Sequence, residues 1–278
     1  MKKYPEELIS SLEEKALALR KDVIGMMGVG VSGHIGGAMS AAEMMATLYF
    51  QRLRYDPRNP RKEGRDRFLL SKGHAGIIQY ACLVEAGILP RSVMSTFKEP
   101  DSILQGHPDV LKTPGIEAGT GSLGQGLSVA LGMALGQRLN GETSRTYVMM
   151  GDGEINEGQI WEAAMAAANF RVDNLVGIVD VNGLQATGFC KDRFDMGDLA
   201  AKWAAFGWHV ISIDGHDIRA ILSALDEAET VKGMPTMILM KTVKGKGIGF
   251  AENNPGYHNT TLNADTFEEA MHDLSKGV

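Results

Sequence analysis

Two side chains that carry oxygen donors follow two β-prone stretches of the sequence. Asp152 lies in Gly151-Asp152-Gly153-Glu154-Ile155-Asn156-Glu157-Gly158, directly after a hydrophobic run, and Asn182 follows the apolar run 175–181. One helix and one strand separate them, roughly the 30 residues of a strand–helix–strand unit, so both would lie at the carboxyl ends of parallel strands. With the main-chain carbonyl of Leu184 they supply three hard oxygen ligands. Magnesium takes about six, so the pattern predicts a metal that clamps a diphosphate.

Each half of this pattern also has a purely structural interpretation. An Asp-Gly pair is typical of a tight turn, and Asn182 before a glycine is typical of a left-handed turn residue. Glu157, the helical stretch that begins Trp161-Glu162-Ala163-Ala164 and the Asn182-Gly183-Leu184 ending together favour the metal site. The glycines around Asp152 would let the chain leave the strand sharply, so that the next helix offers its amino end to an anion.

Four of the seven histidines lie beside glycine or proline in predicted loops and are candidates for chemistry. They are His34, His74, His107 and His258. Imidazole titrates near neutrality, so these side chains can donate or accept protons and can hydrogen-bond alkoxide oxygens. The other three, His209, His216 and His272, are interpreted as surface or hydrogen-bonded residues. Asp217 is predicted to cap the helix that follows it.

The composition is that of an ordinary globular protein. Of 278 residues, 44% are hydrophobic and 22% are charged, with a net charge of −6. Disorder is therefore excluded, and an acidic chain without basic clusters argues against a nucleic-acid binder. No apolar run approaches the roughly 20 residues of a membrane span, and the first residues turn acidic where a signal peptide would be apolar. Two cysteines, Cys82 and Cys190, predict no disulfide framework and a soluble, cytoplasmic protein.

Short β-prone runs alternate with helical patterns along the second half of the chain. Strands are predicted at 147–150, 175–181, 208–213 and 236–243. Helices are predicted at 6–27, 40–53 with Ser40 as N-cap, 120–139, 158–170, 196–206 and 217–230, and a surface loop at 54–66. Such alternation indicates an α/β fold, a parallel β-sheet with helices on both faces. Because no linker divides the chain, residues 1–278 are predicted to form a single domain.

The spacing of the Gly-Asp-Gly segment and Asn182 resembles the thiamine diphosphate signature, and further motifs narrow the resemblance to transketolases. These motifs are Ser32-Gly33-His34, Leu70-Ser71-Lys72-Gly73-His74-Ala75, Gly106-His107-Pro108-Asp109 and Thr120-Gly121-Ser122-Leu123-Gly124-Gln125-Gly126. The resemblance covers residues 8 to 262. It implies the diphosphate-binding domain of the thiamine diphosphate-binding fold, with thiamine diphosphate and Mg²⁺ (or Ca²⁺ or Mn²⁺) as cofactors.

The resemblance also implies a role for each matched residue. The substrate's hydroxyl or carbonyl oxygens would contact His34 and His107, and His258 would reach both cofactor and donor. Glu157 would lie at the subunit interface and couple to the activating glutamate, which completes the catalytic set. The cofactor would be bound by His74, Gly121, Ser122, Leu123, Gly153, Asn182 and His258, and the metal by Asp152, Asn182 and Leu184.

Three positions depart from the family pattern. Ile35 and Ser122 stand where the family usually has proline, and Asn259 follows the last histidine where many members have glycine. These departures leave the metal ligands unchanged and leave the sugar donor open. Pentose phosphates are the default donor, and a specialised sugar is the alternative.

A complete transketolase also needs a glutamate that hydrogen-bonds the aminopyrimidine ring, and in the family this residue lies on the next domain. Glu154, Glu157 and Glu162 are on the diphosphate side and cannot take that role. We therefore expect an amino-terminal transketolase subunit that transfers a two-carbon ketol unit between sugar phosphates. A partner chain would carry the pyrimidine-binding and carboxyl-terminal domains, in an α2β2 assembly.

Other functions fit parts of the pattern. The α subunit of a 2-oxo acid dehydrogenase shares the Gly-Asp-Gly segment, but the histidine motifs at 34, 74 and 107 disfavour it. A piece of a deoxyxylulose-phosphate synthase fits segment 106–109 less well than a transketolase does. A non-catalytic thiamine diphosphate-binding module is disfavoured because the predicted ligands and histidines are all present.

Overall fold

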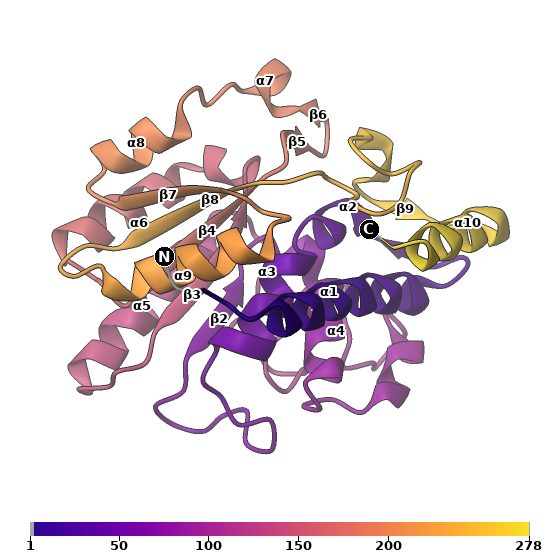
Figure 1. Cartoon of the computed structure of the whole chain (residues 1–278), viewed down its shortest axis with the longest axis horizontal. Coiled ribbons are helices and arrows are strands. Elements are labelled where there is room, and N and C mark those ends of the chain that lie inside the picture. The colour runs from indigo at the N-terminus through magenta and orange to yellow at the C-terminus, as the bar shows by residue number, and fades with distance from the viewer. Residues whose placement is uncertain (1–2, 278) are drawn as a thin grey trace.

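Five parallel strands form the central sheet, in the order β2-β3-β4-β8-β7 (Figure 1). The computed structural model describes residues 3–277, so the ends of the predicted domain, 1–2 and 278, lie outside it. The strands are β2 (Arg67–Leu70), β3 (Thr146–Gly151), β4 (Leu175–Val181), β8 (Thr236–Lys241) and β7 (His209–Asp214). Every neighbouring pair is parallel. The predicted fold class is confirmed.

The sheet separates two hydrophobic cores, because successive residues of a strand point to opposite faces. In β3, Tyr147 and Met149 join one core, whereas Val148 and Met150 join the other. The first core lies under α1 (Glu6–Met27), α2 (Ile35–Met39), α3 (Ala42–Thr47), α4 (Gly76–Glu85) and α9 (Ile218–Thr230). The second lies under α5 (Gln125–Leu139), α6 (Gly158–Asn169) and α8 (Leu199–Ala205). Burial of both faces explains why the strands are almost continuously apolar.

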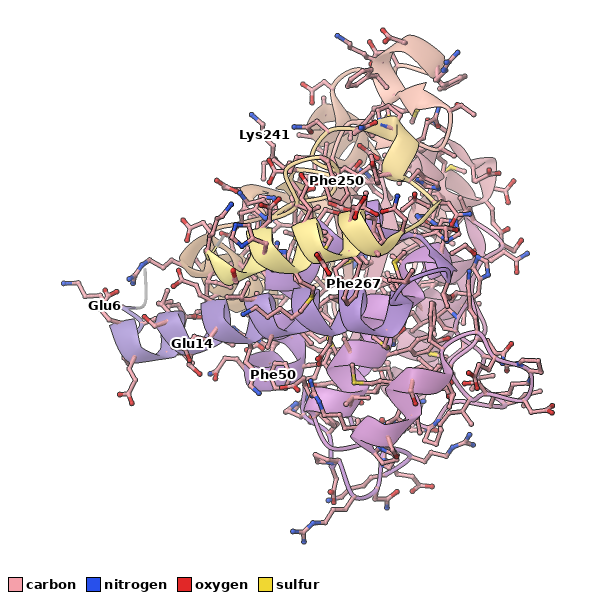
Figure 2. The ribbon with its side chains drawn as sticks, turned by 90° about the vertical axis from the view of Figure 1, so that its right-hand side faces the viewer. Glu6, Glu14, Phe50, Lys241, Phe250 and Phe267 are labelled. Atoms are coloured by element: carbon pink, nitrogen blue, oxygen red, sulfur yellow. The ribbon has the colours of Figure 1, made fainter. Side chains whose placement is uncertain are left out.

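The last helix closes the first core from outside. Figure 2 shows α10 (Ala264–Ser275) running alongside α1, with Phe267 packed against that core. A capping box at Asn263 and Thr266 begins α10. A two-stranded antiparallel pair, β1 (Ser32–Gly33) and β9 (Thr260–Thr261), ties the segment before α10 to the segment after α1. Within residues 3–277 no helix is both long and apolar enough to cross a membrane.

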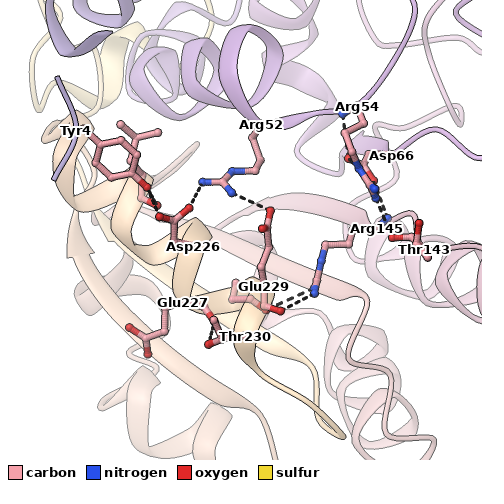
Figure 3. Close-up of polar contacts among 12 residues, drawn as sticks. Tyr4, Arg52, Arg54, Asp66, Thr143, Arg145, Asp226, Glu227, Glu229 and Thr230 are labelled. Carbon is pink, nitrogen blue, oxygen red and sulfur yellow. Dashed lines mark hydrogen bonds and ion pairs between the residues drawn. The ribbon is translucent and has the colours of Figure 1, made fainter. Parts of the chain in front are cut away.

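Ion pairs hold the amino ends of the strands, at the end of the sheet away from the predicted site (Figure 3). Asp66, directly before β2, pairs with the Arg54 guanidinium at 2.8 Å and accepts a hydrogen bond from the Arg145 main chain, directly before β3. Arg52 bridges Asp226 at 2.7 Å and Glu229 at 2.8 Å on α9. The amino ends of β2 and β3 are therefore fastened to each other and to the loop that begins at Arg54.

Most predicted elements are confirmed with shifted ends. The helix at 6–27 and the strand at 175–181 have the predicted bounds. The helix predicted at 120–139 begins only at Gln125, because Gly121 and Gly124 adopt φ values of +126° and +90°, which a continuous helix does not allow. The short strands β5 (Leu184–Gln185) and β6 (Gly188–Phe189), and the short helix α7 (Cys190–Arg193), follow β4.

The helix predicted at 40–53 is wrong in its start and its continuity. The chain forms α2, then α3, then a short π-helical turn over Leu48–Arg52. Ser40 is not an N-cap. It is buried over the sheet instead of lying at a free helix end, and its hydroxyl therefore donates to Asp180 Oδ2 at 2.6 Å.

Candidate functional site

A cavity of about 380 Å³ lies at the carboxyl ends of β3 and β4. It is lined by residues from segments that are far apart in the sequence. Those among the predicted site residues are His74, Gly121, Leu123, Asp152, Gly153, Glu157, Asn182, Leu184 and His258. The sheet therefore brings together most of the residues that the motifs singled out.

Asp152 links the tips of the two strands. Its side chain is 6% exposed, and its carboxylate accepts hydrogen bonds from Gly153 N at 2.8 Å and Gly183 N at 2.5 Å. The Asp152 main-chain N–H also bonds the Asp180 carbonyl at 3.2 Å. Burial and the neighbouring Asp180 carboxylate raise the pKa of Asp152 to about 6. A divalent metal beside such a buried carboxylate would stabilise its ionised form.

Asn182 and Leu184 lie on the same rim as Asp152. The Asn182 amide donates to Asp180 Oδ2 at 2.9 Å, and its oxygen accepts from Leu184 N at 3.1 Å. Within residues 3–277 no group of three or more His, Cys, Asp or Glu side chains could hold a metal by itself. The donor set here is one carboxylate, one amide oxygen and one carbonyl, and it fits a hard cation that takes its remaining ligands from phosphate.

A buried ion pair supports this rim from below, and the sequence motifs did not single it out for this role. Lys72 Nζ lies 2.6 Å from Asp180 Oδ2 and 2.7 Å from the Gly37 carbonyl, and both charged side chains are almost fully buried. Burial alone would raise the pKa of Asp180, but Lys72 and the hydroxyls of Ser40 and Thr242 outweigh it and hold the pKa below its usual range. Asp180 in turn accepts the Asn182 amide, so the pair orients a predicted metal ligand.

Lys244 places a second cation in the cavity, and the sequence predictions missed it. Its Nζ donates to the Leu184 carbonyl at 2.8 Å and lies 2.9 Å from His258 Nδ1. Burial lowers the pKa of Lys244 to about 8, although Asp152 opposes that shift. The only signal in the sequence is the glycine-rich stretch 245–249 that follows, which marks a tight turn without showing what it faces.

The four candidate histidines form one cluster. The ring of His34 lies 5.3 Å from His74, 6.1 Å from His107 and 5.3 Å from His258, between ring centres, and His74 lies 5.0 Å from His258. Burial lowers the pKa of His34 to about 4, of His258 to about 4 and of His74 to about 2. Burial and Lys98 lower the pKa of His107 as well. The site therefore presents neutral imidazoles near pH 7.

The remaining predicted residues lie at the edge of the cavity. Glu157 is exposed and precedes α6, and Leu123 is 37% exposed. Gly121 packs on His107, because a Cβ there would lie 2.7 Å from the imidazole Cδ2. Ser122 is exposed and is not among the cavity-lining residues.

Two of the three histidines interpreted as structural bond to neighbouring residues. His216 lies 3.1 Å from Glu43 and accepts from Val243 N at 2.9 Å, and His209 lies 2.7 Å from Glu227. The predicted cap at Asp217 is confirmed, since its carboxylate accepts from the first turn of α9.

The geometry thus places a cavity at the carboxyl edge of a parallel sheet, lined by oxygen donors and lysines, with a histidine cluster at its side. The family described as the thiamine diphosphate-binding domain of transketolase matches residues 13–275. The chain belongs to this transketolase family.

Curated relatives match this chain over nearly their whole length. The chain is 43% identical to 6-deoxy-6-sulfo-D-fructose transketolase subunit SqwG of Clostridium sp. (strain MSTE9), with 95% of this chain and 96% of the relative covered. It is 40% identical to one of the subunits of the apulose-4-phosphate transketolase of Actinobacillus succinogenes, with 95% of each covered. The expected amino-terminal transketolase subunit is therefore confirmed, and the 2-oxo acid dehydrogenase alternative is not favoured.

Solved structures agree with this assignment. The transketolase of Pichia stipitis in complex with sedoheptulose 7-phosphate superposes with a TM-score of 0.90 at 32% identity, over 95% of this chain and 41% of that chain. The Campylobacter jejuni transketolase gives a TM-score of 0.90 at 31% identity, over 96% and 43%. The present chain thus corresponds to less than half of these transketolases.

Proposed function

We propose that this chain works with a partner chain to move a two-carbon ketol unit from a ketose phosphate to an aldose phosphate. The observation that carries the proposal is the convergence of most of the predicted cofactor residues on one cavity beside a cluster of four neutral histidines. We propose further that residues 1–278 are a single diphosphate-binding domain and that it acts in the cytoplasm. Two free thiols, Cys82 and Cys190, support a reducing compartment.

Thiamine diphosphate would be held by its diphosphate end. We propose that Asp152, Asn182 and the Leu184 carbonyl hold Mg²⁺, and that the diphosphate contacts His74, the main chain of segment 121–123 and Gly153. Thiamine diphosphate, when bound, supplies the electron sink for breaking and forming a carbon–carbon bond next to a carbonyl. Lys244 adds a positive charge to the same cavity, which supports an anionic ligand there.

The histidines would handle the oxygens of the sugar. Because His34 and His107 are neutral near pH 7, each can accept a proton or donate a hydrogen bond to a hydroxyl or carbonyl oxygen. His258 is held by Lys244 at 2.9 Å and would contact both donor and cofactor. The close packing of the four rings supports one shared substrate pocket.

The partner chain would complete the site. Glu157 and Leu123 line the cavity and are nevertheless exposed, which supports a cavity that opens onto another subunit. We propose that this subunit carries the pyrimidine-binding and carboxyl-terminal domains with the activating glutamate, and that two copies of each chain form an α2β2 assembly. Glu157 would then face the activating glutamate across the interface.

Two donor classes are open to this site. Pentose phosphates are the default. A specialised sugar is favoured by similarity to relatives whose names specify 6-deoxy-6-sulfo-D-fructose and apulose 4-phosphate. This chain covers 96% and 95% of these two relatives.

The proposed function is tested by assaying the chain with its partner for ketol transfer and, in parallel, for decarboxylation of pyruvate. Transfer between sugar phosphates that requires thiamine diphosphate, a divalent metal and both chains is expected. Full activity of this chain alone would refute the split organisation. Cofactor binding without turnover on any sugar phosphate would favour the non-catalytic module.

A further inference from the structure

Glu154 is a buried carboxylate whose hydrogen bonds reach three separate segments of the cavity wall. Its Oε1 accepts from Gly124 N at 3.0 Å and from the Ser71 hydroxyl, and its Oε2 accepts from Gly151 N at 3.1 Å. The residue is 2% exposed. In the part of the chain that the structure describes, no lysine or arginine forms an ion pair with it. Burying a carboxylate without an ion pair is costly, so its three donors must hold it in place.

Each of these donors lies within three residues of a position that the proposed function assigns to the cofactor. Ser71 comes directly before segment 72–74, and Gly124 comes directly after segment 121–123. Gly151 comes directly before Asp152 and Gly153. One carboxylate is therefore hydrogen-bonded to three segments of the cavity wall. Segment 72–74 follows β2, segment 152–153 follows β3, and segment 121–123 precedes α5.

The surrounding backbone leaves little freedom for another arrangement. Gly124 has a φ of +90° and precedes α5, and a Cβ at Gly126 would clash with Ser71 Oγ. A Cβ at Gly73 would lie 2.5 Å from Thr120 Oγ1. Segments 71–73 and 120–126 are thus in direct contact, and the Glu154 carboxylate bonds to both of them and to Gly151.

We propose that Glu154 is a positioning residue that fixes the spacing of the three cofactor-binding segments. The inference rests on the proposed function only for the identity of the cofactor. A carboxylate suits this role because each of its oxygens accepts one main-chain N–H. A glutamine has a single acceptor oxygen. Its NH₂ group would face one main-chain N–H, and two donors cannot bond to each other, so one segment would lose its hydrogen bond to residue 154.

The test compares three variants in the assembled two-chain complex. Glu154→Gln keeps the size of the side chain and removes one acceptor. Ser71→Ala removes one donor and keeps the carboxylate, so it reports on the same junction if Glu154→Gln fails to fold. Glu269→Gln makes the same chemical change at an exposed site on α10 and serves as the control.

Two measurements separate a positioning role from a merely structural one. The first is calorimetric titration with thiamine diphosphate at saturating Mg²⁺, and the second is amide hydrogen exchange at Gly124 and Gly151 without cofactor. For Glu154→Gln we expect a Kd raised about 10- to 100-fold, as for loss of residues that orient metal ligands, with turnover at saturating cofactor largely retained. Exchange should quicken at one or both glycines. For Ser71→Ala we expect about a two- to tenfold rise in Kd, and none for Glu269→Gln.

The proposal is overturned if the Kd of Glu154→Gln for thiamine diphosphate stays within about twofold of that of the unaltered protein, whether or not the thermal stability of the complex falls, since one hydrogen bond is worth more than that. If Glu154→Gln fails to fold, the same result for Ser71→Ala overturns it. Unchanged exchange at both glycines in Glu154→Gln also overturns it. If the unaltered complex itself does not bind thiamine diphosphate, the proposed function fails instead, and the exchange measurement still tests the junction.

Discussion

The buried histidine cluster predicts a proton titration far from that of free imidazole. The perturbation is pH, and the measured groups are the His34 and His258 rings. Burial is the first cause of their lowered pKa. For His34 the neighbouring His107 and the cations Lys98 and Lys244 add to it. For His258 the further causes are Lys244, His34 and Lys72, which all disfavour a second positive charge nearby.

The size of the effect follows from the pKa values. With the ordinary pKa of 6.5, a histidine at pH 6 holds about three charged forms for each neutral one. With a pKa of about 4, the same ring holds about one charged form for 100 neutral ones. Catalysis that needs neutral imidazole therefore stays unaffected by these two groups down to about pH 5.

The same shift makes the folded state sensitive to acid. The unfolded chain takes up protons on these histidines near pH 6.5, whereas the folded chain takes them up only near pH 4. The folded state is therefore destabilised as the pH falls below about 6.5, and the loss stops growing below about 4.

Nuclear magnetic resonance of ¹³C-labelled histidine rings in the purified chain measures the titration directly. His34→Gln and His258→Gln assign the two signals by their disappearance. We expect midpoints near 4 for both. Midpoints near 6.5 would refute the reasoning, because they would place both rings in solvent and away from the lysines.

Three further changes test other parts of the structure. Lys72→Met leaves Asp180 buried without its ion pair and should lower the free energy of unfolding by about 3–5 kcal/mol in a guanidinium titration, whereas a loss below about 1 kcal/mol would contradict the buried pair. Gly126→Ala forces a methyl group against Ser71 and should cost about 1–3 kcal/mol in the same assay; a neutral result would mean that the two segments do not touch. His34→Ala should lower turnover while the Kd for thiamine diphosphate stays unchanged, and a raised Kd would move His34 from the substrate to the cofactor.

The strands and the site-bearing loops were predictable because their patterns are local. β4 was found with its full bounds since seven consecutive residues are nearly all buried and end in a polar turn. β2 was missed because it has only four residues and follows a charged loop. α4 and α10 were also missed.

What the sequence could not supply were contacts between distant segments. Lys72 lies within a recognised motif, but its pairing with Asp180 joins residues 108 positions apart. Lys244 meets Leu184 and His258 only because β8 lies beside β4 in the sheet. Ser40 satisfied a local capping rule, but burial over the sheet gave its hydroxyl to Asp180 instead. Local rules selected candidate residues, and packing decided which of them touch.

The central claim is that a divalent metal held by Asp152 and Asn182 anchors the diphosphate of thiamine diphosphate. Calorimetric titration of the two-chain complex with thiamine diphosphate, with and without Mg²⁺, tests it for the unaltered chain and for Asp152→Ala. Binding that depends on Mg²⁺ in the unaltered chain and is lost in Asp152→Ala is the predicted result. Equal, Mg²⁺-dependent affinity in both would contradict the claim.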